Sequence, residues 1–229
     1  MIKPNTVKDW KKFIGTEIPS SLELEPVIFD YLQGDFKIID VGCGFGKTVF
    51  ELYKKGYRDI YGVDINESGI KFAKARARES GFNPLPNLSV GNAISLNFPN
   101  HTFDFVICQA FWTTIIAKNE RNKIIKEIGR ILKRAGILYV ADFGQTWAHP
   151  SYKQAYYKGI EKQYEIGTFE VFDKKTQEFK YLAHHYTREE LEDLLKKGGF
   201  KKPGYYKQTS FTTQSGNQIN GHVLLAVKN

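Results

Sequence analysis

Three glycines at alternate positions are the first residues in this chain whose spacing points to chemistry. The apolar run Ile38–Val41 leads directly into Gly42, Gly44 and Gly46. Glycine accepts a positive φ and lets a ligand approach the backbone without a Cβ in the way. A helical pattern begins at Lys47, and the first turn of a helix offers unpaired N–H groups and a positive dipole end. The stretch therefore predicts a nucleotide-type binding turn.

Polar side chains follow each of the other short apolar runs in this part of the chain. Asp64 follows the second run, Asn92 the third, Gln109 the fourth and Asp142 the fifth. If these runs are parallel strands, their carboxyl ends meet at one edge of the sheet, where ligands of such sheets bind. We therefore expect these polar groups and the glycine turn to form one site.

Glycine spacing argues against two common nucleotide sites. The dinucleotide fingerprint Gly-x-Gly-x-x-Gly would need a glycine where Lys47 stands. A phosphate-binding loop ending in Gly46-Lys47-Thr48 would need a glycine at position 41, where the chain has Val41.

The same stretches resemble the motifs of a known family. Asp40–Gly46 resembles the first motif of the class I S-adenosylmethionine-dependent methyltransferases, and Asp64 that family's ribose-binding acid. Residues 91–93 are similar to its adenine-contacting turn, 103–106 to its fourth strand, and 132–136 to its approach to strand five. Asn92 departs from the commoner aspartate but keeps a carbonyl acceptor, and Arg134-Ala135 replaces a usual Pro-Gly.

The resemblance implies S-adenosylmethionine as the cofactor and a set of residues that bind it. Asp64 would accept from the ribose hydroxyls, a charge-assisted interaction, and Asp40 from the cofactor ammonium. Ile65 would lie on the adenine, Asn92 and the Ala93 N–H would contact the adenine edge, and Gln109 would stand near the methionyl group. The full set is Asp40, Gly42, Cys43, Gly44, Gly46, Asp64, Ile65, Asn92, Ala93 and Gln109.

Strands alternating with helices predict an α/β fold. We expect a Rossmann-like, doubly wound, seven-stranded mixed sheet with an antiparallel final strand, helices on both faces, and an aromatic-rich helix and hairpin inserted after strand five. As one domain over 1–229, the chain would divide into N-terminal helices (1–35), a cofactor-binding core (36–143), the insertion (144–186) and a last helix with two strands (187–229). The expected helices around Val7–Ile14 and Leu22–Leu32 would form either a lid or packing against a sheet edge.

The insertion is where the methyl acceptor is expected, because this region commonly covers the acceptor in the methyltransferases that the chain resembles. Ten aromatic residues can either wall an apolar pocket or pack the hairpin onto the sheet. His184 and His185 are weak candidates for a general base, and Tyr157 and His149 are weaker candidates still. A base is needed only if the acceptor arrives protonated, so no catalytic residue is fixed.

Composition limits the remaining choices. The net charge of +8 permits a nucleic acid partner without requiring one. Two isolated cysteines, with no signal-peptide pattern and no membrane-length apolar run, predict a cytoplasmic protein and no metal site.

We expect methyl transfer to a small molecule by in-line displacement. The alternatives are an RNA (tRNA) methyltransferase of the same fold and a non-catalytic S-adenosylmethionine-binding module. The acceptor atom and the oligomeric state stay open.

Overall fold

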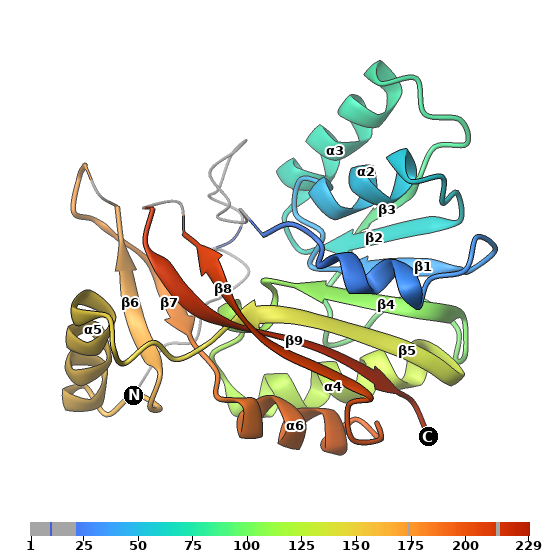
Figure 1. Ribbon diagram of the computed structural model, residues 1–229. Coiled ribbons are helices and arrows are strands. Elements are labelled where there is room, and N and C mark those ends of the chain that lie inside the picture. Colours follow the sequence, from blue (N-terminus) through green and yellow to red (C-terminus); the bar gives the residue numbers. More distant parts are fainter. Residues whose placement is uncertain (1–9, 11–21, 174, 214–215) are drawn as a thin grey trace.

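A seven-stranded mixed sheet organises the chain (Figure 1). The computed structural model describes residue 10 and residues 22–173, 175–213 and 216–229. The strand order is β3-β2-β1-β4-β5-β9-β8. Neighbours from β3 to β5 pair in parallel, whereas β9 is antiparallel to both β5 and β8. The strands are β1 (Ile38–Val41), β2 (Ile60–Asp64), β3 (Asn87–Val90), β4 (Phe103–Gln109), β5 (Leu132–Phe143), β8 (Tyr205–Thr212) and β9 (Gln218–Val227).

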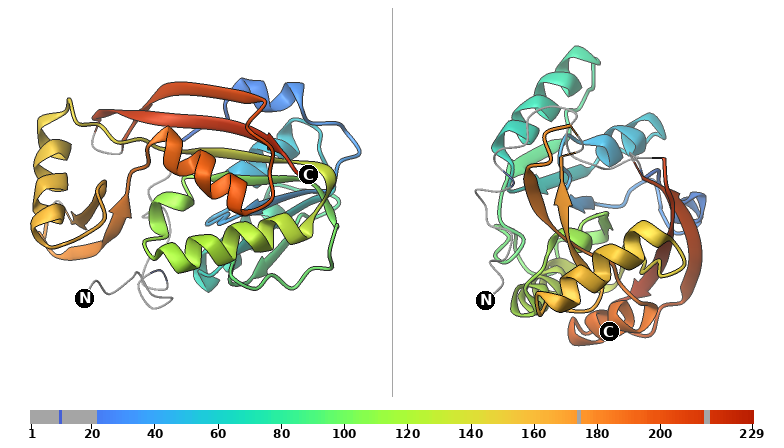
Figure 2. Two further views of the ribbon diagram at one scale, coloured as in Figure 1. Left: turned by 90° about the horizontal axis from the view of Figure 1, so that it is seen from below. Right: turned by 90° about the vertical axis from the view of Figure 1, so that its left-hand side faces the viewer.

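Helices cover both faces of this sheet, as the alternation of patterns predicts. On one face, α2 (Lys47–Lys54) and α3 (Glu67–Glu79) pack on alternate strand residues such as Ile38 and Ile60. On the other, α4 (Lys118–Ile131) and α6 (Arg188–Lys197) pack on the intervening residues, such as Ile39; Figure 2 shows these two helices along the same face. The doubly wound fold class is therefore confirmed.

The segment after β5 forms a separate layer at one end of the sheet (Figures 1 and 2). It consists of α5 (Pro150–Glu161) and a two-stranded antiparallel hairpin of β6 (Thr168–Phe172) and β7 (Phe179–His184). Tyr156, Phe169 and Tyr181 form the centre of its own small core. The predicted aromatic helix and hairpin are thus present, and their aromatic rings pack mostly on one another.

Two elements differ from the sequence-based expectation. The helix expected over Leu22–Leu32 is only the 3₁₀ helix η2 (Pro26–Asp30). Proline disfavours helical backbone in the residue before it, and Glu25 is extended (φ −62°, ψ 130°). The helix around Val7–Ile14 falls outside the described residues except at Trp10. In addition, β5 begins at Leu132 directly after α4, so the expected turn at 134–136 lies inside the strand, where Ala135 has a φ of +57°.

Candidate functional site

A cavity of about 330 Å³ opens at the carboxyl ends of β1 and β2. Its described wall holds two carboxylates, Asp64 and Glu120, and no lysine or arginine. The other lining residues come from the glycine turn, the ends of β2, β3 and β4, the start of α4, and Trp10: Gly42, Gly44, Val63, Ile65, Asn66, Gly91, Asn92, Ala93, Ile94, Ala110, Phe111, Thr114, Ile115 and Ile124.

The glycine turn has the backbone conformation that its sequence predicts. Gly42, Gly44 and Gly46 have φ values of +81°, +51° and +81°, in the region that favours glycine. A Cβ on Gly42 would lie 2.4 Å from Cδ2 of Phe111, so this position also needs glycine for space. The backbone N–H groups of Gly42 and Cys43 both donate to Val63 O, which fixes the turn against β2.

Asp64 joins the turn to the start of α3. One carboxylate oxygen accepts from the Gly44 N–H and the other from the Asn66 N–H, each at 2.8 Å. Burial raises the pKa of this carboxyl, while the backbone N–H groups of Asn66, Gly44 and Ile65 act to lower it. Each carboxylate oxygen has two lone pairs, so Asp64 can still accept hydrogen bonds from a ligand in the cavity.

Two of the predicted polar ligands lie behind the cavity wall. Asp40 is only 2% exposed, and its pKa is raised to about 8 by burial and by the charge of Asp64, against a lowering hydrogen bond from Thr48. Gln109 donates to Leu22 O at 2.8 Å, and its buried side-chain oxygen has no partner among the described residues. Neither side chain lines the cavity.

Six of the ten predicted cofactor residues line the cavity: Gly42, Gly44, Asp64, Ile65, Asn92 and Ala93. Asp40, Cys43, Gly46 and Gln109 do not. Asn92 is exposed at the rim, where its side-chain oxygen accepts from the Ile94 N–H at 3.0 Å. One lone pair of that oxygen therefore stabilises its own turn.

Sequence reasoning missed the opposite wall of the cavity. Phe111 and Ile115 belong to the connection between β4 and α4, which has no periodic pattern. Glu120 stands in the first turn of α4, where an acidic residue is common because it complements the helix dipole. Their residue types alone therefore gave no signal of a binding wall.

The structure places all four candidate bases, His149 included, away from the cavity wall. His184 is fully buried, with Nδ1 2.8 Å from the Thr168 hydroxyl. His185 is 4% exposed, with Nδ1 2.7 Å from the Tyr156 hydroxyl, and burial lowers its pKa to about 3. Tyr157 is exposed and lies against the ring of Trp147. The hairpin thus directs His185 into the packing of the insertion and His184 toward Glu190 of α6.

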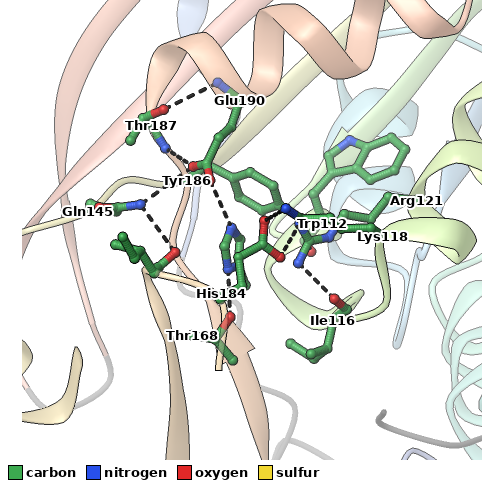
Figure 3. A network of polar contacts seen from close by, with 12 residues as sticks. Trp112, Ile116, Lys118, Arg121, Gln145, Thr168, His184, Tyr186, Thr187 and Glu190 are labelled. Carbon is green, nitrogen blue, oxygen red and sulfur yellow. Dashed lines mark hydrogen bonds and ion pairs between the residues drawn. The ribbon is translucent and has the colours of Figure 1, made fainter. Parts of the chain in front are cut away.

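A polar network around the buried His184 and Arg121 lies between the insertion, α4 and α6 (Figure 3). Glu165, His184 and Glu190 bring metal-ligand atoms within 4.8 Å of one another. Lys118 and Arg121, however, each lie 3.0 Å from one oxygen of Glu165. Two cations therefore already balance the two carboxylates, and a metal ion would add positive charge to a neutral group. The absence of a metal site stays a prediction.

The strand order, the positive-φ glycine turn and the acid at the end of β2 together define the class of S-adenosylmethionine-binding methyltransferase folds. A methyltransferase domain family model matches residues 39–140. A solved S-adenosylmethionine-dependent methyltransferase from Methanosarcina mazei is 40% identical, with a TM-score of 0.85 over 90% of this chain and 99% of that one. The chain therefore belongs to the class I S-adenosylmethionine-dependent methyltransferases, and the cofactor of this family of enzymes is S-adenosylmethionine.

More distant relatives act on different acceptors. The ubiquinone/menaquinone biosynthesis C-methyltransferase of Vibrio cholerae is 24% identical over 76% of this chain and 67% of its own length. The eEF1A lysine and N-terminal methyltransferase of Mus musculus is 28% identical over 50% of this chain and 17% of its own. The chain spans less than half the length of the first curated relatives that it matches, 43% and 37%.

The cavity fits this cofactor. Asp64 offers a carboxylate to hydroxyl donors, Ile65 an apolar surface, and the positive-φ glycines Gly42 and Gly44 a wall without side chains. These features match the ribose and the adenine of S-adenosylmethionine, and a methionyl part that passes close to the protein backbone. Within the described ranges, no helix is long and apolar enough to cross a membrane.

Proposed function

We propose that this protein transfers a methyl group from S-adenosylmethionine to a small-molecule acceptor lying between the cavity and the aromatic insertion. One observation carries the proposal: Trp10 belongs to both regions. It lines the cavity, and its ring centroid is 5.3 Å from that of Tyr181 in β7. An acceptor held beside the insertion would therefore be next to the cofactor.

The charge of the cavity wall supports a small molecule over RNA. The described lining holds Asp64 and Glu120 and no basic residue, whereas RNA-binding surfaces carry lysine and arginine that neutralise phosphates. The basic residues Lys71, Lys74, Arg76 and Arg78 lie on α3, outside this wall. An RNA acceptor is the second candidate, carried only by the net charge of +8.

Methyl transfer at this site relies on position rather than on a histidine base. The cofactor supplies an electrophilic methyl group, and an acceptor held in line with it needs orientation and exclusion of water. Buried His185, with its pKa near 3, stays neutral and is a poor proton acceptor at neutral pH. We propose that Asp64 and the glycine turn hold the cofactor, with Asp40 buried behind the turn, while the insertion encloses the acceptor.

The two cysteines support a cytoplasmic location as part of this proposal. Cys43 and Cys108 are both free and buried, and burial raises the pKa of each thiol. Free thiols of this kind are typical of a reducing compartment.

The test follows the transferred methyl group. The enzyme is incubated with methyl-tritiated S-adenosylmethionine and a cell extract, which is then separated into RNA, protein and small molecules. We expect enzyme-dependent label in the small-molecule fraction, insensitive to ribonuclease and protease. Label in RNA or protein would contradict the proposed acceptor class. Cofactor binding without label in any fraction would favour a non-catalytic module.

A further inference from the structure

The wall of the cavity opposite the glycine turn is an irregular segment whose backbone is held by side chains from elsewhere. This segment, 110–117, joins β4 to α4 and includes the 3₁₀ helix η3 (Trp112–Thr114). It lines the cavity with Ala110, Phe111, Thr114 and Ile115. Because such a segment has few ladder hydrogen bonds of its own, its position depends on whatever binds its free carbonyl and N–H groups.

Arg121 holds the end of this segment. Its Nε donates to Ile115 O at 2.6 Å and its Nη2 to Ile116 O at 2.9 Å. The third nitrogen, Nη1, lies 3.0 Å from a carboxylate oxygen of Glu165. The Arg121 side chain is only 7% exposed, so one buried guanidinium connects the cavity wall to the insertion (Figure 3).

A second connection runs in parallel with the first. The Tyr186 hydroxyl, just beyond β7, donates to Trp112 O at 2.9 Å. The Arg121 guanidinium lies 5.3 Å from the centre of the Tyr186 ring, within the range of a cation–π contact. Arg121 and Tyr186 thus connect this wall of the cofactor cavity to the insertion, the segment that would cover the acceptor.

We propose that Arg121 and Glu165 are positioning residues that couple the cofactor cavity to the acceptor-covering insertion. The inference rests on the proposed function for the role of the insertion, but the coupling itself concerns only this chain and the cofactor. When the insertion packs in its observed position, Glu165 pairs with Arg121. Arg121 in turn holds the carbonyl groups of Ile115 and Ile116 in place. Because such coupling is reciprocal, cofactor binding will also stabilise the insertion.

The charge of Glu165 is the element of the network that can be tested alone. Without it, the Arg121 guanidinium keeps its charge in a buried place and loses its ion pair. Lys118 carries the same charge as Arg121 and cannot replace the carboxylate of Glu165. The charge of Glu190 also acts on Arg121, but the ion pair of Arg121 among the described residues is with Glu165. We therefore expect Arg121 to shift toward water and release the cavity wall, although Glu165 itself does not line the cavity.

The experiment compares two glutamates of the insertion. Glu165→Gln removes the pair with Arg121. The control Glu170→Gln removes the pair of Glu170 with Lys162 (2.6 Å), and the hydrogen bonds of Glu170 come from Lys162 and Tyr164 rather than from segment 110–117. Calorimetric titration with S-adenosylhomocysteine should show affinity at least about fivefold weaker for Glu165→Gln, the lower end of typical coupling between sites. Glu170→Gln should match the wild type within about twofold, in the range of an exposed pair.

Hydrogen exchange separates coupling from a loss of stability. In the wild type, S-adenosylhomocysteine should slow exchange of the amides in 165–172, and Glu165→Gln should abolish that protection. If the variant has a lower Tm but wild-type affinity and protection, Glu165 is only a stabilising residue and the coupling is refuted. If the wild type itself binds no S-adenosylhomocysteine, the proposed function fails instead.

Discussion

The two sides of this molecule use polar residues in opposite ways. Around the glycine turn, the carboxylates of Asp64 and Glu120 face an open cavity. In the insertion, His184 and His185 are buried and bind the hydroxyls of Thr168 and Tyr156. The first region keeps hydrogen-bonding capacity for a ligand. The second uses most of its capacity within its own packing, although the buried Nε2 of His184 has no hydrogen-bond partner among the described residues. Cofactor binding is therefore expected to respond to single polar substitutions near the turn. Substitutions inside the insertion's own core should change folding stability instead, whereas Glu165, which pairs with Arg121, should affect cofactor binding.

The largest effect is expected at Asp64. Asp64→Asn leaves one acceptor oxygen and places an amide near a backbone N–H that needs an acceptor. Losing charge-assisted hydrogen bonds of about 1.5–3 kcal/mol each should weaken S-adenosylhomocysteine binding roughly a hundredfold, measured by calorimetry. The exposed neighbour Glu67, which does not line the cavity, supplies the control Glu67→Gln. Equal affinity of Asp64→Asn and wild type would refute the role of Asp64.

The next largest effect is expected when alanine replaces glycine in the binding turn, and a second glycine serves as the control. Gly42→Ala and Gly56→Ala both force a Cβ onto positive φ, +81° and +102°, which costs about 1–2 kcal/mol. Only at Gly42 does the new Cβ also meet Phe111, because nothing lies within 4 Å of it at Gly56. We expect both variants to lose stability, and only Gly42→Ala to lose about tenfold or more in cofactor affinity. A similar loss of affinity in both would contradict a specific role for the turn.

The insertion should show the reverse behaviour. Tyr156→Phe removes a buried hydroxyl that lies 2.7 Å from Nδ1 of His185 and accepts from the Thr146 N–H at 3.2 Å. The unsatisfied partners should lower the free energy of unfolding by about 1–3 kcal/mol, measured by urea denaturation. Cofactor affinity should stay within about twofold, and the exposed Tyr157→Phe should change neither. If Tyr156→Phe weakened cofactor binding without lowering the free energy of unfolding, the role of Tyr156 in packing would be contradicted.

The last prediction concerns the pH dependence of stability rather than cofactor binding. The pKa of Asp40 is about 8 in the folded protein, against an ordinary value of 3.8. Between these values the folded state binds more protons than the unfolded state, so the free energy of unfolding should fall as pH rises from 4 to 8. Asp40→Asn should flatten this slope in pH-dependent urea denaturation. Part of it will remain, because burial also raises the pKa of Asp142, to about 7. An unchanged slope would show that Asp40 is already ionised at low pH.

The sequence predicted the fold and one wall of the cavity because both depend on local patterns. Gly42, Asp64 and Asn92 follow strands directly, and parallel strands must bring their ends together. The other wall depends on how segment 110–117 folds back, which is set by Arg121, Asp142 and Tyr186 from three separate elements. The weak base candidate His184 does not line the cavity for a similar reason, because hairpin register decides which way a strand residue points.

The measurement that tests the central claim most directly is a calorimetric titration of the full chain with S-adenosylhomocysteine, with ATP and NAD as comparison ligands. The account predicts one site of micromolar affinity for S-adenosylhomocysteine, lost in Asp64→Asn, and no heat from the other two. Absence of heat at millimolar S-adenosylhomocysteine, or equal binding of ATP or NAD, would contradict the assignment of this cavity.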